Sequence, residues 1–291
     1  MGNRKKVDKQ IGKSFGKIIW KRLTRNRLGM LGLAILCVLI LLAVLAPWLF
    51  PEGYDAQDYG ARFIAPCWEH LCGTDNLGRD IFVRIAYGAR VSMVIGLVST
   101  SVSLLFGVSL GAIAGYVGGK IDSIIMRVLD LAMSIPQLLM AITLSAALGT
   151  GIFNCMLAVG ITRTPTFARI TRASVLLERN KEYVEAARCI NAGSVRIVLT
   201  NVLPNAMAPI LVQATMGVAR AIITAAELSF IGLGVQPPSP EWGAMLSTSR
   251  QYMTQYPWTV IAPGIAIMLA VFALNVLGDG LRDALDPRLK D

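Results

Sequence analysis

Six stretches of the chain are apolar and almost free of charge, and polar segments separate them. The first, residues 28–50, would extend about 34 Å as an α-helix, which exceeds the roughly 30 Å hydrocarbon core of a bilayer. The others cover residues 91–117, 124–148, 152–172, 206–233 and 258–277. The fourth is the weakest because Arg163, Pro165 and Arg169 interrupt it. This pattern predicts an all-α, polytopic membrane protein with six transmembrane helices.

Composition supports a membrane protein and excludes two other classes. Of 291 residues, 54% are hydrophobic and 16% are charged, whereas about 25% of residues are charged in ordinary soluble domains. So apolar a chain cannot cover a water-soluble globule with polar surface, and disordered chains are polar and highly charged. The net charge of +10 does not indicate a nucleic-acid partner, because the sequence has no helix-turn-helix, zinc-finger or RNA-binding signature.

The positive charge is concentrated near the N-terminus. Residues 1–27 contain ten basic side chains and one acid, whereas residues 52–90 contain six acids and four arginines. Cytoplasmic flanks of membrane proteins are rich in Lys and Arg, so the N-terminus is predicted to be cytoplasmic. Six crossings then place the C-terminus in the cytoplasm as well. The same topology puts the acidic loop outside and the basic segment 163–196 inside.

This topology divides the chain into five segments. We expect a basic cytoplasmic tail, a first transmembrane helix, an extracytoplasmic loop, a core with five further helices, and a cytoplasmic C-terminal tail. In that order they cover residues 1–27, 28–50, 51–87, 88–278 and 279–291.

Two cysteines of the outer loop, Cys67 and Cys72, flank His70, the sole histidine of the chain. A disulfide between them is one interpretation, because the compartment outside the membrane is oxidising. A metal site is a second, although Cys-x2-His-x-Cys supplies three ligands where structural zinc takes four. Ordinary loop packing is the third, and the sequence leaves all three open.

Motifs of nucleotide hydrolysis and of common enzyme chemistry are missing from the sequence. Gly12-Lys13-Ser14 ends like a phosphate-binding loop, but Val7 occupies the position that requires the first glycine. No His-Glu-x2-His or Gly-x-Ser-x-Gly motif occurs. We therefore expect a chain that is not an enzyme, does not hydrolyse ATP and binds no cofactor or metal of its own.

Small residues recur every four positions at the end of the second apolar stretch, at Gly107, Gly111, Gly115 and Gly119. On a helix they lie along one face, where a second helix can approach closely. That neighbour belongs either to the same chain or to another subunit, and the sequence allows both.

The segment 182–204 between the fourth and fifth apolar stretches reads as two short helices with a break of small and polar residues. Glu185-Ala186-Ala187, followed by Leu203-Pro204 at the matching spacing, resembles the coupling loop of ABC-importer permease subunits. Asn191 stands where that family usually has glycine, and asparagine tolerates the left-handed backbone better than most residues. Gly193 is a second candidate for this turn. The resemblance implies that the ATPase-coupling residues are Glu182, Glu185, Ala186, Ala187, Arg188, Asn191, Gly193, Leu203 and Pro204.

Further segments resemble the dipeptide/oligopeptide/nickel permeases, and specifically the second, C-type subunit of each pair. They are residues 73–80, 87–90, 227–238, 241–245 and 277–288, and the likeness runs from Leu28 to Arg288 in order and spacing. On residue chemistry alone, residues 73–80 would form a turn-rich loop with Asp75, Arg79 and Asp80 in local ion pairs. Contact with an extracytoplasmic binding protein is the alternative role for this loop.

The family resemblance implies a type I ABC importer permease in a bacterial inner membrane. Its partners would be a second homologous permease in a heterodimer, two cytoplasmic ATPase subunits that hold ATP and Mg, and an extracytoplasmic substrate-binding protein. Peptides are the expected cargo, with nickel, glutathione or another small solute as alternatives. A secondary transporter would show repeated halves with broken helices, which the sequence lacks, and a membrane enzyme would need a metal or nucleophile constellation.

Three charged residues fall inside or near the predicted membrane helices: Asp130, Arg220 and Glu227. Charges are costly next to lipid tails, so these side chains should face the bundle interior or a wet translocation path. Arg220 and Glu227 are two helical turns apart and therefore share a face. Asp130, with Arg127, could instead reach back to the membrane surface.

Overall fold

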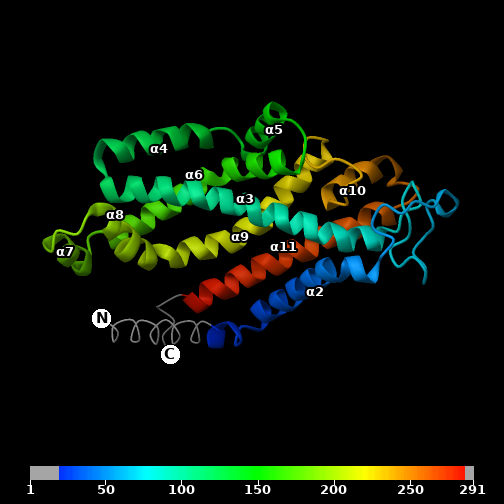
Figure 1. Ribbon diagram of the computed structural model, residues 1–291, viewed down its shortest axis with the longest axis horizontal. Coiled ribbons are helices and arrows are strands. Elements are labelled where there is room, and N and C mark those ends of the chain that lie inside the picture. Colours follow the sequence, from blue (N-terminus) through cyan, green and yellow to red (C-terminus); the bar gives the residue numbers. More distant parts are fainter. Residues whose placement is uncertain (1–19, 286–291) are drawn as a thin grey trace.

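The computed structural model describes residues 20–285, and within this range the regular structure is helical apart from one isolated β-bridge between Thr74 and Asp80. Long helices run side by side along the molecule, with short α7 and α8 at one end and the loop 51–80 with α10 at the other (Figure 1). The helices are α2 (Arg27–Leu49), η1 (Tyr59–Ala61), α3 (Ile81–Val117), α4 (Gly119–Met133), α5 (Gln137–Leu148), α6 (Ile152–Glu178), α7 (Glu182–Cys189), α8 (Ser194–Ile197), η2 (Val198–Val202), α9 (Leu203–Phe230), α10 (Trp242–Ser249), η3 (Arg250–Tyr252) and α11 (Trp258–Leu285).

Four helices of the described residues are long and apolar enough to cross a membrane, so the predicted count of six is not reproduced as it stands. They are α2, α3, α11 and the continuous helix Ser194–Phe230, which contains α8, η2 and α9. A fifth span arises if α4 and α5 are taken together. The predicted third helix is broken here by a bend of 89°, because Pro136 disfavours helical backbone in the residue before it. The predicted fourth helix, α6, is long enough to span but too polar to qualify.

The last helix is longer than predicted, and most of the predicted N-terminal tail lies outside the described residues. Residues 1–19 and 286–291 lie outside the described residues, so most of the predicted basic tail is not described. The last helix α11 continues to Leu285, through residues assigned to a C-terminal tail. Helix α3 begins at Ile81, well before the predicted start at residue 91, and Asp80 caps it by accepting a hydrogen bond from the Val83 amide at 3.0 Å.

The glycine ladder joins α3 to α6 within the chain. A Cβ atom added at Gly107 would lie 2.5 Å from the Cβ of Phe167, and one at Gly111 would lie 2.4 Å from the carbonyl oxygen of Ala168. Gly115 faces α6 in the same way. Gly119 does not take part, because it opens α4 with φ +58° and has no neighbour within 4 Å of such a Cβ. Of the two alternatives, three glycines fit the intrachain one.

Helix α10 is fastened to both α9 and α3. Buried Glu241 caps it by accepting hydrogen bonds from the amides of Gly243 at 2.9 Å and Ala244 at 2.8 Å. Burial raises the pKa of the Glu241 carboxyl. The indole Nε1 of fully buried Trp242 donates to the Ile85 carbonyl at 3.1 Å. Residues 241–245, which resemble a family motif, therefore hold the end of the bundle together.

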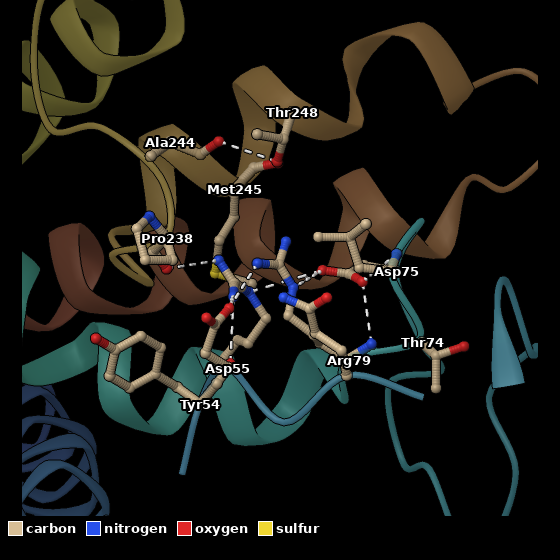
Figure 2. Close-up of polar contacts among 12 residues, drawn as sticks. Tyr54, Asp55, Thr74, Asp75, Arg79, Pro238, Ala244, Met245 and Thr248 are labelled. Atoms are coloured by element: carbon tan, nitrogen blue, oxygen red, sulfur yellow. Dashed lines mark hydrogen bonds and ion pairs between the residues drawn. The ribbon is translucent and has the colours of Figure 1, made fainter. Parts of the chain in front are cut away.

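A buried charge cluster fixes the loop 51–80 to the bundle (Figure 2). Arg79 pairs with Asp75 at 2.8 Å and with Asp55 at 2.9 Å. Arg84 of α3 donates to the Tyr54 carbonyl at 3.2 Å and to the Pro238 carbonyl at 3.4 Å. Residues 73–80 thus form the local ion pairs that residue chemistry predicts, and the cluster ties this loop to α3 and to the segment before α10.

Arg79→Ala should destabilise the protein because it removes the 2.8 Å partner of the buried Asp75 carboxylate and leaves only the Arg84 guanidinium, 3.9 Å away. Complete loss of one partner of a buried ion pair costs about 3–5 kcal/mol, and the remaining Arg84 contact keeps the expected loss toward the lower end of that range. The midpoint of thermal unfolding in detergent measures this loss. Arg62→Ala is the matched control, since Arg62 belongs to the same loop but is exposed and lies over the Tyr59 ring. Equal midpoints for the two variants would show that the cluster adds nothing to stability.

Candidate functional site

The segment 182–204 forms a compact knob at one end of the bundle. Helix α7 is followed by Asn191, whose φ of +56° lies in the left-handed region. This backbone is the one predicted for Asn191, because it stands at the position where the resembled family usually has glycine. Gly193 has φ −61°, so it does not share this role, and the turn is made by Asn191. After Gly193 the helix Ser194–Phe230 runs without a break through the π-helical turn η2. The knob is therefore continuous with α9.

An apolar base holds the knob against the bundle. Val184 of α7, Ile197 of α8 and Val202 of η2 are at most 1% exposed. They pack with Ala112 of α3 and Val175 of α6 in one cluster. Ala187 and Leu203, two of the predicted coupling residues, are half-buried against it. A side-chain cluster this closely packed resists deformation, so a force on α7 reaches three long helices.

Polar contacts reinforce the base. Lys181 donates to the Glu178 carboxylate at 2.6 Å, and the Tyr183 hydroxyl donates to the same carboxylate. Burial, followed by the Glu178 carboxylate, raises the pKa of Tyr183 to about 12, so its hydroxyl keeps its proton at neutral pH. Arg188 lies over the Tyr116 ring at 5.5 Å, and Arg179 donates to the Gly115 carbonyl at 2.9 Å. These contacts tie α7 to the ends of α3 and α6.

The outer surface of the knob is exposed and mixed in character. Glu182, Glu185, Ala186, Arg188 and Pro204 are all exposed. Sequence reasoning missed Ile190, which is 79% exposed, and did not separate Val195, 74% exposed, from its buried neighbours. For Val195 the spacing could have indicated exposure, because Val195 and Leu199 are four residues apart and share one helix face, whereas Ile197 lies on another. Large exposed apolar side chains beside charges are typical of a protein contact surface.

Ion pairs join α4 to α6 in the part of the chain before the bend between α4 and α5. Asp130 accepts from Arg169 at 2.5 Å, with both side chains about half exposed. Asp122 accepts a two-pronged contact from Arg172, with both hydrogen bonds at 2.5 Å. The partner of Asp130 is therefore Arg169 rather than Arg127. The other three residues of these pairs were missed because their partners lie about forty to fifty positions away.

Arg220 and Glu227 lie on one exposed face of α9, as their spacing predicts, together with Ile223 and Phe230. Within residues 20–285 neither charged side chain forms an ion pair or a side-chain hydrogen bond. Sequence reasoning did not single out Arg163 of α6 as a site residue. It is 3% exposed, and its Nε and Nη1 atoms have no hydrogen-bond partner among the described residues.

Of the cysteines and the histidine in the loop 51–80, His70 has a structural role, because it contacts the residue that caps α3. His70 Nδ1 lies 2.8 Å from the Asp80 carboxylate that caps α3. All five cysteines lie in the described range and are free thiols, with Cys67 exposed and Cys72 half-buried. Burial raises the pKa of the Cys72 thiol. In that range no group of three residues is placed to hold a metal ion, and the disulfide stays a prediction.

Comparison with known proteins identifies the family. Residues 107–291 match the family of binding-protein-dependent transport system inner membrane components. Residues 14–66 match the N-terminal transmembrane domain of oligopeptide transport permease C. The chain belongs to the binding-protein-dependent permease family. It is thus a multi-pass inner membrane protein and the permease subunit of an ABC importer.

Relatives of this permease are similar along almost their whole length. The dipeptide transport system permease protein DppC of Alkalihalophilus pseudofirmus is 46% identical, over 93% of this chain and 89% of that protein. The di/tripeptide permease DppC of Pseudomonas aeruginosa is 43% identical, over 94% and 93%. The glutathione permease GsiD of Pectobacterium atrosepticum is 43% identical, over 93% and 90%.

A solved structure confirms the fold of the permease. The inward-facing MetNI methionine ABC transporter matches with a TM-score of 0.58 at 17% identity, over 71% of this chain and 97% of that one. The fold is therefore that of a type I ABC importer permease, as the sequence predicts.

Proposed function

We propose that this chain is the peptide-translocating permease subunit of an ATP-driven importer. Relatives named as dipeptide and di/tripeptide permeases, 43% to 46% identical over nearly the whole chain, support this cargo. The relative named as a glutathione permease favours glutathione, itself a tripeptide, as a second candidate cargo. A second homologous permease completes the pathway as a heterodimer. An extracytoplasmic binding protein delivers the substrate.

Two cytoplasmic ATPase subunits hold ATP and Mg and supply the energy. The knob at 182–204 fits a cleft in one of them, with Glu185 and Ala186 at the contact. Both termini are then cytoplasmic, because the start of α2 and the end of α11 lie toward the α7 end of the bundle (Figure 1). This chain contributes no catalytic group to ATP hydrolysis.

The observation that carries the proposal is the continuity between the knob and α9. ATP-driven closure of the ATPase pair moves α7, and the buried base around Val184 and Ile197 transmits that motion to α3 and α6. Helix α9 moves as well, because it continues directly from α8. A rigid connection is required, since a flexible loop would absorb the displacement.

Reconstitution tests the proposal. The chain is purified with its co-expressed partners and placed in liposomes with the binding protein, and ATP-dependent uptake of a radiolabelled dipeptide, glutathione and nickel is compared. We expect a complex of two permeases with two ATPases that takes up the dipeptide when ATP is present. Uptake by the chain alone, or uptake of nickel but not of peptide, would contradict it.

A further inference from the structure

One face of α9 carries two opposite charges with no partners in the described part of the chain. Arg220 and Glu227 are both exposed, and seven residues of α-helix separate them by about 10.5 Å along the axis. Both lie within the span Ser194–Phe230. Unpaired charges do not face lipid, so this face of α9 meets water, a ligand or another subunit.

Arg163 makes the Arg220 end of this face strongly cationic. Arg163 follows Val159 by one turn of α6. Val159 packs in one buried cluster with Ala221, the neighbour of Arg220 on α9, so the two cations come from adjoining turns. The Nε and Nη1 atoms of Arg163 have no hydrogen-bond partner among the described residues. A buried guanidinium with unmet donors beside a second guanidinium is costly unless an anion approaches. The chemistry therefore calls for a carboxylate at Arg220.

Two hollows lie along the same face, on either side of Arg220. The one toward Phe230 has a volume of about 380 Å³ and is apolar, lined by Ile223, Phe230 and Leu138 among others, with Glu227 as its one charged lining residue. The one toward the knob has a volume of about 400 Å³ and is lined by Gln213, Met216 and Arg282 among others. The apolar hollow thus begins at Ile223, about one turn beyond Arg220, and extends around Glu227 as far as Ile231.

We propose that this face of α9 binds both termini of a short zwitterionic peptide during translocation. Arg220, supported by Arg163, holds the terminal carboxylate, and Glu227 holds the terminal ammonium. The apolar hollow around Glu227 receives side chains. An extended chain spans about 3.3–3.6 Å per residue, so a tripeptide matches the separation and a dipeptide reaches it with help from the long Arg220 side chain. This inference rests on the proposed peptide transport.

Such a site distinguishes peptides by their ends rather than by their sequence. Charge-assisted hydrogen bonds discriminate strongly, whereas an apolar hollow discriminates weakly between side chains. Peptides with free termini are therefore favoured over blocked ones, and the site tolerates many sequences.

The test uses the complete importer in liposomes, with its binding protein saturated by each peptide. Uptake of a tripeptide with free termini, its C-terminal amide and its N-acetyl form is measured for wild type, Arg220→Gln, Glu227→Gln and Arg220→Lys. The binding protein's own preference cancels, because each variant is compared with wild type on the same peptide. Arg127→Gln is the matched control, an exposed arginine on α4 away from this face.

Arg220→Gln should lower kcat/KM for the free tripeptide by about 10-fold or more, yet leave the amide within about 2-fold of wild type. Glu227→Gln should likewise lower kcat/KM for the free tripeptide by about 10-fold or more and leave the N-acetyl peptide within about 2-fold of wild type. Arg220→Lys should recover much of the preference for a free carboxylate. Equal losses for all three peptides would overturn the inference and indicate pairing with the second permease instead. No loss in either variant would overturn it as well. Absence of any peptide uptake by wild type would overturn the proposed function itself.

Discussion

Replacing Ala186 with tryptophan should lower ATP-driven uptake by about 5- to 150-fold while the protein still inserts and assembles with its second permease. Ala186 is exposed on α7, so an indole there does not disturb the buried base of this chain. It does collide with a partner that packs closely on the knob, and overfilling a packed contact costs about 1–3 kcal/mol. Uptake and substrate-stimulated ATP hydrolysis in liposomes measure the loss.

Reversing the charge at Glu185 should give the same result by a different physical route. Glu185 is exposed one residue before Ala186, and a like charge opposite a complementary site costs several kcal/mol. Lys120→Trp controls for bulk at an exposed position outside the knob, at the start of α4. Normal uptake by both Ala186→Trp and Glu185→Arg would show that α7 does not couple to an ATPase.

The local structure of the knob was predictable because its signal is local, whereas its coupling role stays a prediction. Glu185-Ala186-Ala187 and Leu203-Pro204 are close in sequence, and the backbone at Asn191 follows from the tolerance of asparagine for the left-handed region. Its rigidity was not predictable, since Ala112 and Val175 come from α3 and α6. Packing between segments distant in sequence leaves no periodic trace in either one.

The membrane helices were predictable only where apolar residues form the whole segment. Helix α2 matches its apolar run and α11 begins where its run does but continues past it to Leu285. Helix α3 starts earlier than its run because Arg84 is 3% exposed within the charge cluster. A charged residue normally marks the end of an apolar span. Here Arg84 has partners in the loop 51–80, so the helix continues through it. Helix α6 shows the same effect, since Arg169 and Arg172 are paired with acids on α4.

Arg220 and Glu227 of α9 show a different limit of prediction from sequence. Their shared face followed from spacing, yet Arg163 drew attention only when its burial and unmet donors were seen. Function concentrates where local rules fail, because a chain keeps an unpaired buried cation only when something else pays for it. The face of α9 is therefore where we expect contact with a ligand or another subunit.

Adding a single methyl group at Gly111 should be among the most damaging changes in the bundle. The Cβ of Gly111→Ala would lie 2.4 Å from the Ala168 carbonyl oxygen, so α3 and α6 must move apart along their whole contact. Forced separation of packed helices costs about 1–3 kcal/mol, which lowers the midpoint of thermal unfolding by roughly 2–12 °C in a chain of this size. Gly264→Ala is the matched control, because a Cβ there meets no atom within 4 Å and the residue is also helical. Alanine replaces the more flexible glycine in both, so its favourable effect on helix stability cancels. Midpoints that fall equally, or rise together, would show that α3 and α6 can separate without cost and that the ladder does not set their distance.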